Sequence, residues 1–297
     1  MRNYIPCLLS LIFIQAAQAE QWKYLLDPEL SQWEVFVGVP HETVEIPGHP
    51  PSESKNGRDG TPLGLGNDPL DIVTMIEEDG QPVLHITGQI YAGITTLDEF
   101  DDYHFSCQFK WGDKKWPPRL NQKRDSGVLF HCVGEHGVFW NVWMRSLECQ
   151  IQEGDCGDFI PLGGAGADVQ VSDSPDGKRP VFDPSAPLYS NTGYVTHSGS
   201  KEAPHGEWNT VEIYTLGQTS VFVVNGTPNM VIFNAFQKSP DGNIPLTRGK
   251  LQLQSEAAEI FYRDIKVRPI SDFPDSLANL TKKPEGPVER YIRPDKR

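Results

Sequence analysis

The sequence predicts an all-β domain, either a sandwich or a barrel, for most of this 297-residue chain. Short runs that alternate apolar and polar residues, or that are rich in β-branched and aromatic residues, recur with turn-forming residues between them. None of the intervening segments has the longer apolar period of a helix. After residues 221–224, Asn225 and Gly226 supply the positive φ angles of a tight hairpin. We therefore expect strands over residues 71–77, 83–87, 103–110, 126–132, 147–152, 208–216, 221–224, 250–254 and 260–269.

The chain divides into a leader, one domain and a tail. Residues 1–19 have the marks of an export signal, with Arg2, an apolar run over 5–14 and a small-x-small cleavage site over 17–19. Residues 20–270 are expected to form a single domain, because this length suits one large all-β unit. Residues 271–297 contain several prolines and mixed charges, which predicts an extended peripheral tail. We expect an exported protein, periplasmic or extracellular after cleavage of the signal.

Two long segments interrupt the expected strands. Residues 40–69 and 159–204 are rich in Gly, Pro, Ser and charged residues, which is typical of loops. Loops of this length are usually functional lids or binding loops, or else disordered.

The net charge of the chain limits the classes of molecule that it is expected to bind. With 26 basic and 40 acidic residues, the formal net charge is -14. Nucleic acids and anionic membranes require lysine and arginine concentrated on one face, so the composition argues against both. No run after the leader is long enough to span a membrane. A neutral partner such as a carbohydrate fits this composition.

The cysteines offer two structural alternatives. After Cys7 in the leader come Cys107, Cys132, Cys149 and Cys156, which are either buried free thiols or include one core disulfide. Their spacing matches no structural zinc site.

Two of the expected strands present carboxylates and amides on one face. In a strand, successive side chains point to opposite faces, so the apolar residues of 147–151 and 251–253 share the inner face. The opposite face of these runs carries Glu148, Gln150, Gln152, Gln252, Gln254 and Glu256. If the strands lie close together, two neighbouring carboxylates raise the proton affinity of one, which suits a general base. The alternative is a hydrogen-bonded ladder of Gln and Glu on a solvated face.

Further candidates each have a structural alternative. By alternation His131 shares a face with Leu129, and it is either packed or a catalytic group that polarises a ketone. Trp140 and Trp143 either stack on sugar rings or anchor in the core. Asp155 lies in the run 154–158, which is either a turn whose carboxylate caps backbone amides or a metal-facing loop.

A succession of short motifs runs in order along nearly the whole chain after the leader. They are GQIYAGITT (88–96), DSGVLFH (125–131), LECQIQEGD (147–155), GEWNT (206–210), VFVVNG (221–226) and LQLQSE with FYRDI (251–265). This succession resembles the 3-keto-disaccharide hydrolase family. The resemblance implies a concanavalin-like jelly roll, a sandwich of two antiparallel sheets with long loop insertions. It also implies a concave polar face and an exported protein that acts on oxidised glycosides.

Transferred by position, the family's two polar strands fall on the runs already described. They place Glu148 and Gln150 on the first strand, and Leu253, Gln254, Ser255 and Glu256 on the second. The chain departs from the family at His131, where many members have arginine. The acidic residue that often follows the first strand is here Glu153.

The chemistry implied by the resemblance begins at the acidified hydrogen beside the ketone of a 3-keto sugar. In our hypothesis Glu148 removes this proton, with Glu256 as a second carboxylate, and the anomeric substituent leaves before water adds. Gln150, Gln254 and His131 would orient the sugar or polarise its carbonyl. No cofactor is evident. No set of metal ligands is legible, and a divalent cation remains an open alternative.

Two other functions fit the same residues. A retaining glucanase of the laminarinase type would use Glu148 and Glu153 as its carboxylate pair. That pair requires a bulge near Gln152 and carboxyl groups ~5 to 5.5 Å apart. A lectin-like module would instead bind glycan through the Gln and Trp side chains without catalysis.

Overall fold

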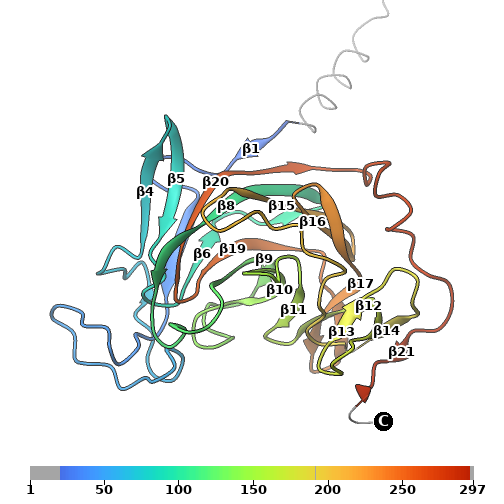
Figure 1. Ribbon diagram of the computed structural model, residues 1–297, viewed down its shortest axis with the longest axis horizontal. Coiled ribbons are helices and arrows are strands. Elements are labelled where there is room, and N and C mark those ends of the chain that lie inside the picture. Colours follow the sequence, from blue (N-terminus) through green and yellow to red (C-terminus); the bar gives the residue numbers. More distant parts are fainter. Residues whose placement is uncertain (1–20, 191, 295–297) are drawn as a thin grey trace, which may run out of the picture.

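The computed structural model describes residues 21–190 and 192–294, so the export signal expected over residues 1–19 lies outside the described residues. Two sheets form arches that lie one inside the other (Figure 1). No α-helix occurs among the described residues, and none of their segments is a helix able to cross a membrane. The predicted jelly-roll sandwich of two antiparallel sheets is confirmed.

The larger sheet forms the outer arch (Figure 1). Its main path runs through β21 (Glu289–Arg290), β14 (Leu188–Ser190), β12 (Ala165–Asp173), β17 (Thr227–Ser239), β16 (Thr219–Val224), β15 (Asn209–Leu216), β8 (Tyr103–Lys115), β20 (Ala258–Pro269), β5 (Gln81–Ile86) and β4 (Val73–Glu78). Short strands join its sides, namely β1 (Lys23–Tyr24), β13 (Pro180–Phe182) and β18 (Gly242–Pro245). Among the described strands, β14 and β21 are the one parallel pair.

The smaller sheet forms the inner arch and carries the polar strands. Its path runs through β11 (Phe159–Leu162), β10 (Arg145–Gln152), β9 (Asp125–Val133), β19 (Arg248–Ser255), β6 (Ala92–Thr96), β2 (Trp33–Val37) and β3 (Gly64–Leu65), with β7 (Phe100–Asp101) beside β19. The strands β10 and β19 both pair with β9, one on each side. Their polar residues are therefore separated by a single strand.

The core lies between the two sheets and follows the alternation of the strands. The smaller sheet contributes the fully buried side chains of Leu147, Cys149, Ile151, Leu251 and Leu253. The larger sheet packs against them with Phe105, Phe109, Val211 and Ile213. The cysteines of the described residues are all buried and free, which confirms the free-thiol alternative. Because the apolar side chains of β10 and β19 point inward, the polar ones point away from the larger sheet.

His131 lies in the core, so the expectation that it shares a face with Leu129 is wrong. The register of β9 shifts at this point against both of its neighbours, and His131 has a left-handed φ of 50°. The extra residue of this bulge reverses the alternation of side chains beyond it. The His131 ring is fully buried and its Nε2 lies 3.0 Å from Oγ1 of Thr215 in the larger sheet. Cys132 turns instead to the free face.

The segment 159–204, expected to be an irregular loop, contributes strands to both sheets. β11 pairs with β10 in the smaller sheet, and β12 pairs with β17 in the larger one. Small residues in β12 weaken the pattern by which a strand is predicted from sequence. Packing requires a small residue at Gly166, because a Cβ atom there would overlap with the ring of Phe236. Beyond residue 270, β21 pairs with β14 and Tyr291 is buried against the core.

The buried state of His131 predicts a pH dependence of stability. Burial lowers the pKa of His131 to about 3, whereas a histidine in the unfolded chain titrates near ~6.5. Below that pH the unfolded state binds the extra proton, so wild-type stability falls by about 1.4 kcal/mol per pH unit as pH drops towards 3. We predict that the stability advantage of wild type over His131→Leu shrinks by about 2 kcal/mol between pH 6.5 and 4.5. Urea unfolding at both pH values measures this change.

The matched control is His205→Leu, because His205 is 41% exposed. This variant should keep the pH dependence of wild type. An advantage over His131→Leu that is the same at both pH values would contradict the prediction.

Candidate active site

The smaller sheet has a free face on the inside of the arch (Figure 1). By alternation, the adjacent strands β10, β9 and β19 place polar side chains on this face. On one side of β9, Gln150 lies opposite Gly127 and Gln152 opposite Asp125. On the other side, Asp125 forms a bridge with Glu256 at the end of β19. Neighbouring strands are ~4.8 Å apart, so these side chains form one patch.

Gly127 makes room for a contact between Glu148 and Gln254. A Cβ atom on Gly127 would overlap with Oε1 of both side chains. Glu148 from β10 and Gln254 from β19 therefore meet above β9. The structure brings together the two residues on which the sequence hypothesis depended.

Arg119, which no sequence motif marks, joins two further carboxylates of the patch. Its guanidinium forms ion pairs with Asp125 and Glu256, the latter over 3.1 Å between Nη1 and Oε1. Asp125 also accepts a hydrogen bond from Nε2 of Gln152 at 2.5 Å. Arg119 lies in the segment between β8 and β9, where its N–H donates to the carbonyl of Trp116 at 2.9 Å.

The carboxyl groups of the patch are buried, which raises their proton affinity. Glu148, Asp125 and Glu256 are 2%, 3% and 4% exposed. Burial raises the pKa of Glu148 well above its usual range, and the charges of Glu256 and Asp125 raise it further. Burial also raises the pKa of Asp125 to about 6, although Arg119 opposes the shift, and burial and Asp125 raise that of Glu256. The carboxylate of Glu148 is therefore a stronger base than that of an exposed glutamate.

A second cation and a phenol border the patch. The guanidinium carbon of Arg58 lies 3.1 Å from the ring centroid of Trp140 and 6.0 Å from that of Tyr91. Burial and the charge of Glu256 raise the pKa of Tyr91 to about 12, so its hydroxyl stays protonated and can donate a hydrogen bond. Trp143 is buried and stacks on Tyr91 with ring centroids 5.9 Å apart. Trp143 therefore belongs to the packing, whereas Trp140 supports Arg58.

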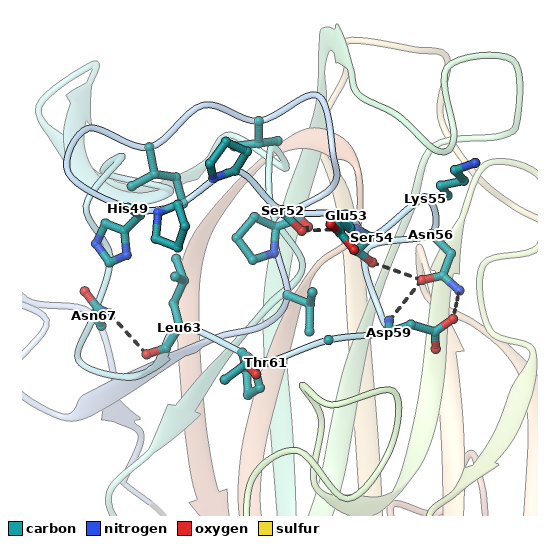
Figure 2. A pocket seen from close by; sticks show the side chains of 18 residues that line it. His49, Ser52, Glu53, Ser54, Lys55, Asn56, Asp59, Thr61, Leu63 and Asn67 are labelled. Carbon is teal, nitrogen blue, oxygen red and sulfur yellow. Dashed lines mark hydrogen bonds between the residues drawn. The ribbon is translucent and has the colours of Figure 1, made fainter.

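The loop over residues 39–67 brings Arg58 to this position. Oδ1 of Asn56 accepts hydrogen bonds from the N–H groups of Arg58 at 2.9 Å and Asp59 at 3.0 Å. The Nδ2 atom of Asn56 donates to the carboxylate of Asp59 at 2.8 Å, as Figure 2 shows. These bonds fix the turn that presents Arg58. The same loop surrounds a separate pocket of about 760 Å³, shown in Figure 2.

An apolar cluster covers the other half of the free face and limits the site to the polar half. It consists of Tyr91, Leu129, Cys132, Val142, Trp143, Met144, Leu162 and Ala257. Gln252 lies beside this cluster and is satisfied within the protein, since it donates to Oγ1 of Thr95 at 2.7 Å and accepts from the N–H of Met144 at 3.3 Å. Gln252 therefore supports the fold.

Several buried polar atoms of the patch have no hydrogen-bond partner among the described residues. They are Nε of Arg58, the hydroxyl of Tyr91, Nε of Arg119, Oδ1 of Asp125, Oε1 of Gln150 and Oε1 of Gln254. Buried polar groups in folded proteins are nearly always hydrogen-bonded. A set of donors and acceptors converging on one patch fits a ligand that is itself rich in hydroxyl groups.

Asp158 extends the patch on the side of β11. The N–H of Gln150 donates to the carbonyl of Asp158 at 2.9 Å, and Phe159, the next residue, points into the core. By alternation the side chain of Asp158 lies on the polar face. It is 1% exposed and accepts a hydrogen bond from the N–H of His197 at 2.7 Å. Burial raises the pKa of Asp158 to about 7.

The arrangement that a glucanase would require is absent from β10. The register of β10 against β9 runs unbroken from Leu147 to Gln152, so the bulge needed near Gln152 does not occur. Glu153 follows the strand and pairs with Arg124 at 2.8 Å instead of joining Glu148.

Asp155 lies at the turn after β10, where it pairs with Lys123 at 2.7 Å. Within residues 21–190 and 192–294, no group of three or more His, Cys, Asp or Glu side chains is arranged to hold a metal ion.

The ion pairs of Arg119 predict a pH-dependent loss of stability in Arg119→Met. Without the guanidinium, the buried carboxyls of Asp125 and Glu256 repel each other, and their pKa values in the folded state rise further. The folded variant then binds protons more tightly than the unfolded chain, so its stability is lost as pH rises from about 4 through those values. We predict a loss of about 3 kcal/mol at pH 8 and a much smaller loss at pH 5, measured by urea unfolding.

Arg248→Met is the matched control. Arg248 also pairs with two carboxylates, Glu99 at 2.9 Å and Asp101 at 3.4 Å, but it is 58% exposed. We expect a loss of less than about 1 kcal/mol there. Equal losses at pH 5 and pH 8 in Arg119→Met would show that Arg119 only packs.

A search of the solved structures found proteins that resemble this chain. A proposed glycosyl hydrolase from Parabacteroides distasonis is 19% identical, with a TM-score of 0.44, and the match covers 84% of this chain and 100% of that one. LamAcat from Zobellia galactanivorans is 11% identical, with a TM-score of 0.43 and coverage of 85% and 99%. The carbohydrate binding module CBM66 from Bacillus subtilis is 8% identical, with a TM-score of 0.39 and coverage of 66% and 91%. No curated protein matches the sequence.

The family assignment rests on a sequence model of a whole domain. The model of the 3-keto-alpha-glucoside-1,2-lyase-like domain matches residues 21–268, which is nearly all of the part of the chain that the structure describes. The match confirms the resemblance found in the sequence motifs. The chain belongs to the 3-keto-alpha-glucoside-1,2-lyase-like domain family.

Proposed function

We propose that this protein cleaves glycosides whose sugar carries a 3-keto group, by elimination across C1 and C2 followed by addition of water. The observation that carries the proposal is the meeting of Glu148 and Gln254 within a buried patch of polar atoms that lack partners among the described residues. The family description, a 1,2-lyase acting on a 3-keto-alpha-glucoside, supports the same chemistry.

Glu148 is the proposed general base. Its carboxylate takes the proton from C2, which is acidic because the neighbouring C3 carries the ketone, and the electron pair moves onto the ketone oxygen as an enolate. Burial raises the pKa of Glu148, so the group is a stronger base than an exposed glutamate. Arg58, Arg119 and Tyr91 supply N–H and O–H donors for the developing negative charge, and one such donor is worth about 3 kcal/mol.

Asp158 is the proposed general acid. When the enolate collapses, a C1=C2 double bond forms, the C1–O bond breaks and the leaving oxygen needs a proton. Burial raises the pKa of Asp158 to about 7, so a large share of the group is protonated near neutral pH. Addition of water then places a hydroxyl on C1 and a hydrogen on C2, which gives a free 3-keto sugar. The export signal expected over residues 1–19 would place this reaction outside the cytoplasm.

The role of Glu148 predicts the behaviour of Glu148→Gln. This variant should fold, because a neutral amide replaces a carboxyl whose ionised form is disfavoured by burial. We expect its turnover of a 3-keto disaccharide to fall about 10²- to 10⁴-fold, the usual contribution of a general base, as measured by product analysis over time.

Glu153→Gln is the matched control, since Glu153 follows the same strand and pairs with Arg124. It should retain wild-type turnover, and the unoxidised parent disaccharide should not be cleaved by either protein. Unchanged turnover in Glu148→Gln would refute the assignment of the base. Cleavage of the unoxidised parent would indicate a glycosidase, and saturable binding without any product would indicate a lectin-like module.

The role of Asp158 predicts a dependence on the leaving group. Asp158→Asn keeps the oxygen that accepts the N–H of His197, but it cannot donate a proton. We expect a loss of about 10²-fold or more for 3-keto glycosides with an alkyl or sugar leaving group. The loss should be much smaller for a p-nitrophenyl leaving group, which departs without protonation. If both kinds of substrate lose activity equally, Asp158 has a structural role alone.

A further inference from the structure

A basic pocket lies near the candidate active site, next to β13 and β14. It encloses about 720 Å³, and its lining includes Lys178, Arg179, Thr192, Tyr194 and Arg290. No Asp or Glu is among its described lining residues. In a chain with a formal net charge of -14, such a concentration of positive charge indicates an anionic ligand.

The side chains of this pocket are arranged to bind an anion. The guanidinium carbon of Arg179 lies 3.7 Å from the ring centroid of Tyr194. Stacking on an aromatic face fixes the plane of a guanidinium and leaves the N–H groups at its edge for a planar acceptor. The hydroxyl of Thr192 is buried and has no hydrogen-bond partner among the described residues, so it offers a further donor. Lys178 pairs with Asp176 over 3.5 Å, and both side chains are largely exposed.

Tyr194 connects this pocket with the catalytic patch. Val195 forms a bridge with Phe159, and the N–H of His197 donates to Oδ1 of Asp158 at 2.7 Å, so the segment that carries Tyr194 runs beside Asp158. Burial raises the pKa of Tyr194, and the charge of Asp158 raises it further. On the other side, the charge of Arg179 lowers the pKa of Asp158 against the effect of burial. The order along the surface is therefore the patch, then Asp158 with Tyr194, then the basic pocket.

This order determines which part of a substrate would reach the pocket. Asp158 is the group that we place at the leaving oxygen, so the pocket beyond it lies on the side of the leaving group. A sugar bound with its C2 hydrogen at Glu148 would extend its leaving group towards Arg179.

We propose that the basic pocket binds an anionic substituent on the leaving group, a carboxylate, sulfate or phosphate held by Arg179, Lys178 and Thr192. The preferred substrates are then 3-keto glycosides whose leaving group is an acidic sugar or another anionic alcohol. This inference rests on the proposed function and adds the class of substrate to it.

The test is a comparison of two 3-keto disaccharides that differ only in the leaving sugar, glucose or glucuronate. Wild type should turn over the glucuronate compound with a kcat/KM about tenfold or more higher, because hydrogen bonds to a charged group are strong. The preference should arise from KM. Arg179→Gln should reduce the preference to near unity, and Lys178→Gln should weaken it.

Arg263→Gln is the matched control. Arg263 also stacks on an aromatic ring, with its guanidinium carbon 4.0 Å from the centroid of Trp208, but it lies on the larger sheet. It should keep the preference of wild type. Equal kcat/KM values for the two disaccharides in wild type would overturn the proposal.

A second arm separates a substituent of the substrate from a free anion. Inorganic sulfate should compete with the glucuronate disaccharide and leave the glucose disaccharide unaffected. If sulfate changes the rate with the glucose disaccharide in wild type and not in Arg179→Gln, the pocket is a site for a free anion, and the proposal is wrong.

Failure of the proposed function can be distinguished from failure of the proposal for the pocket. If wild type turns over neither disaccharide, the proposed function fails, and calorimetric titration with the glucuronate disaccharide still tests the pocket. Binding that is lost in Arg179→Gln and kept in Arg263→Gln would support the pocket, whereas equal binding by all three proteins, or none by wild type, would overturn it.

Discussion

The site depends on keeping several carboxyl groups out of water beside a single paired guanidinium. Glu148, Asp125 and Glu256 are buried together, and Arg119 bridges only the last two. Burying a charge without a partner is costly, so the patch retains protons that exposed carboxyls would release. The energy for this arrangement comes from the apolar core behind the sheet, which holds the strands in register whatever the state of their outward side chains.

In the sandwich, each strand of the smaller sheet has one face that packs in the core and one face that carries the polar groups of the site. Alternation sends Leu147, Cys149 and Ile151 into the core, while the intervening side chains form the patch. Groups held on paired strands keep their relative positions better than groups on loops. The loops add Arg119, from the segment between β8 and β9, and Arg58, from the loop over residues 39–67.

The sequence predicts those features that depend on local periodicity. Strands around 147–152 and 250–254, and the faces on which Glu148 and Gln254 lie, follow from alternation alone. Arg119, Arg58 and Tyr91 have no such signal, because long-range pairing brings them to the patch. His131 could not be placed, since one extra residue in β9 reverses the alternation without leaving a mark in the composition. The strand β12 was missed because its small residues reflect close packing against Phe236.

The buried thiols determine whether folding of this protein depends on disulfide formation. Thiolates are the reactive form of cysteine, and burial raises the pKa of Cys107, Cys132, Cys149 and Cys156, so each stays protonated and shielded from oxidants. Among the described residues no disulfide holds the sandwich together. Its native state rests on packing, and folding therefore needs neither an oxidase nor a disulfide isomerase.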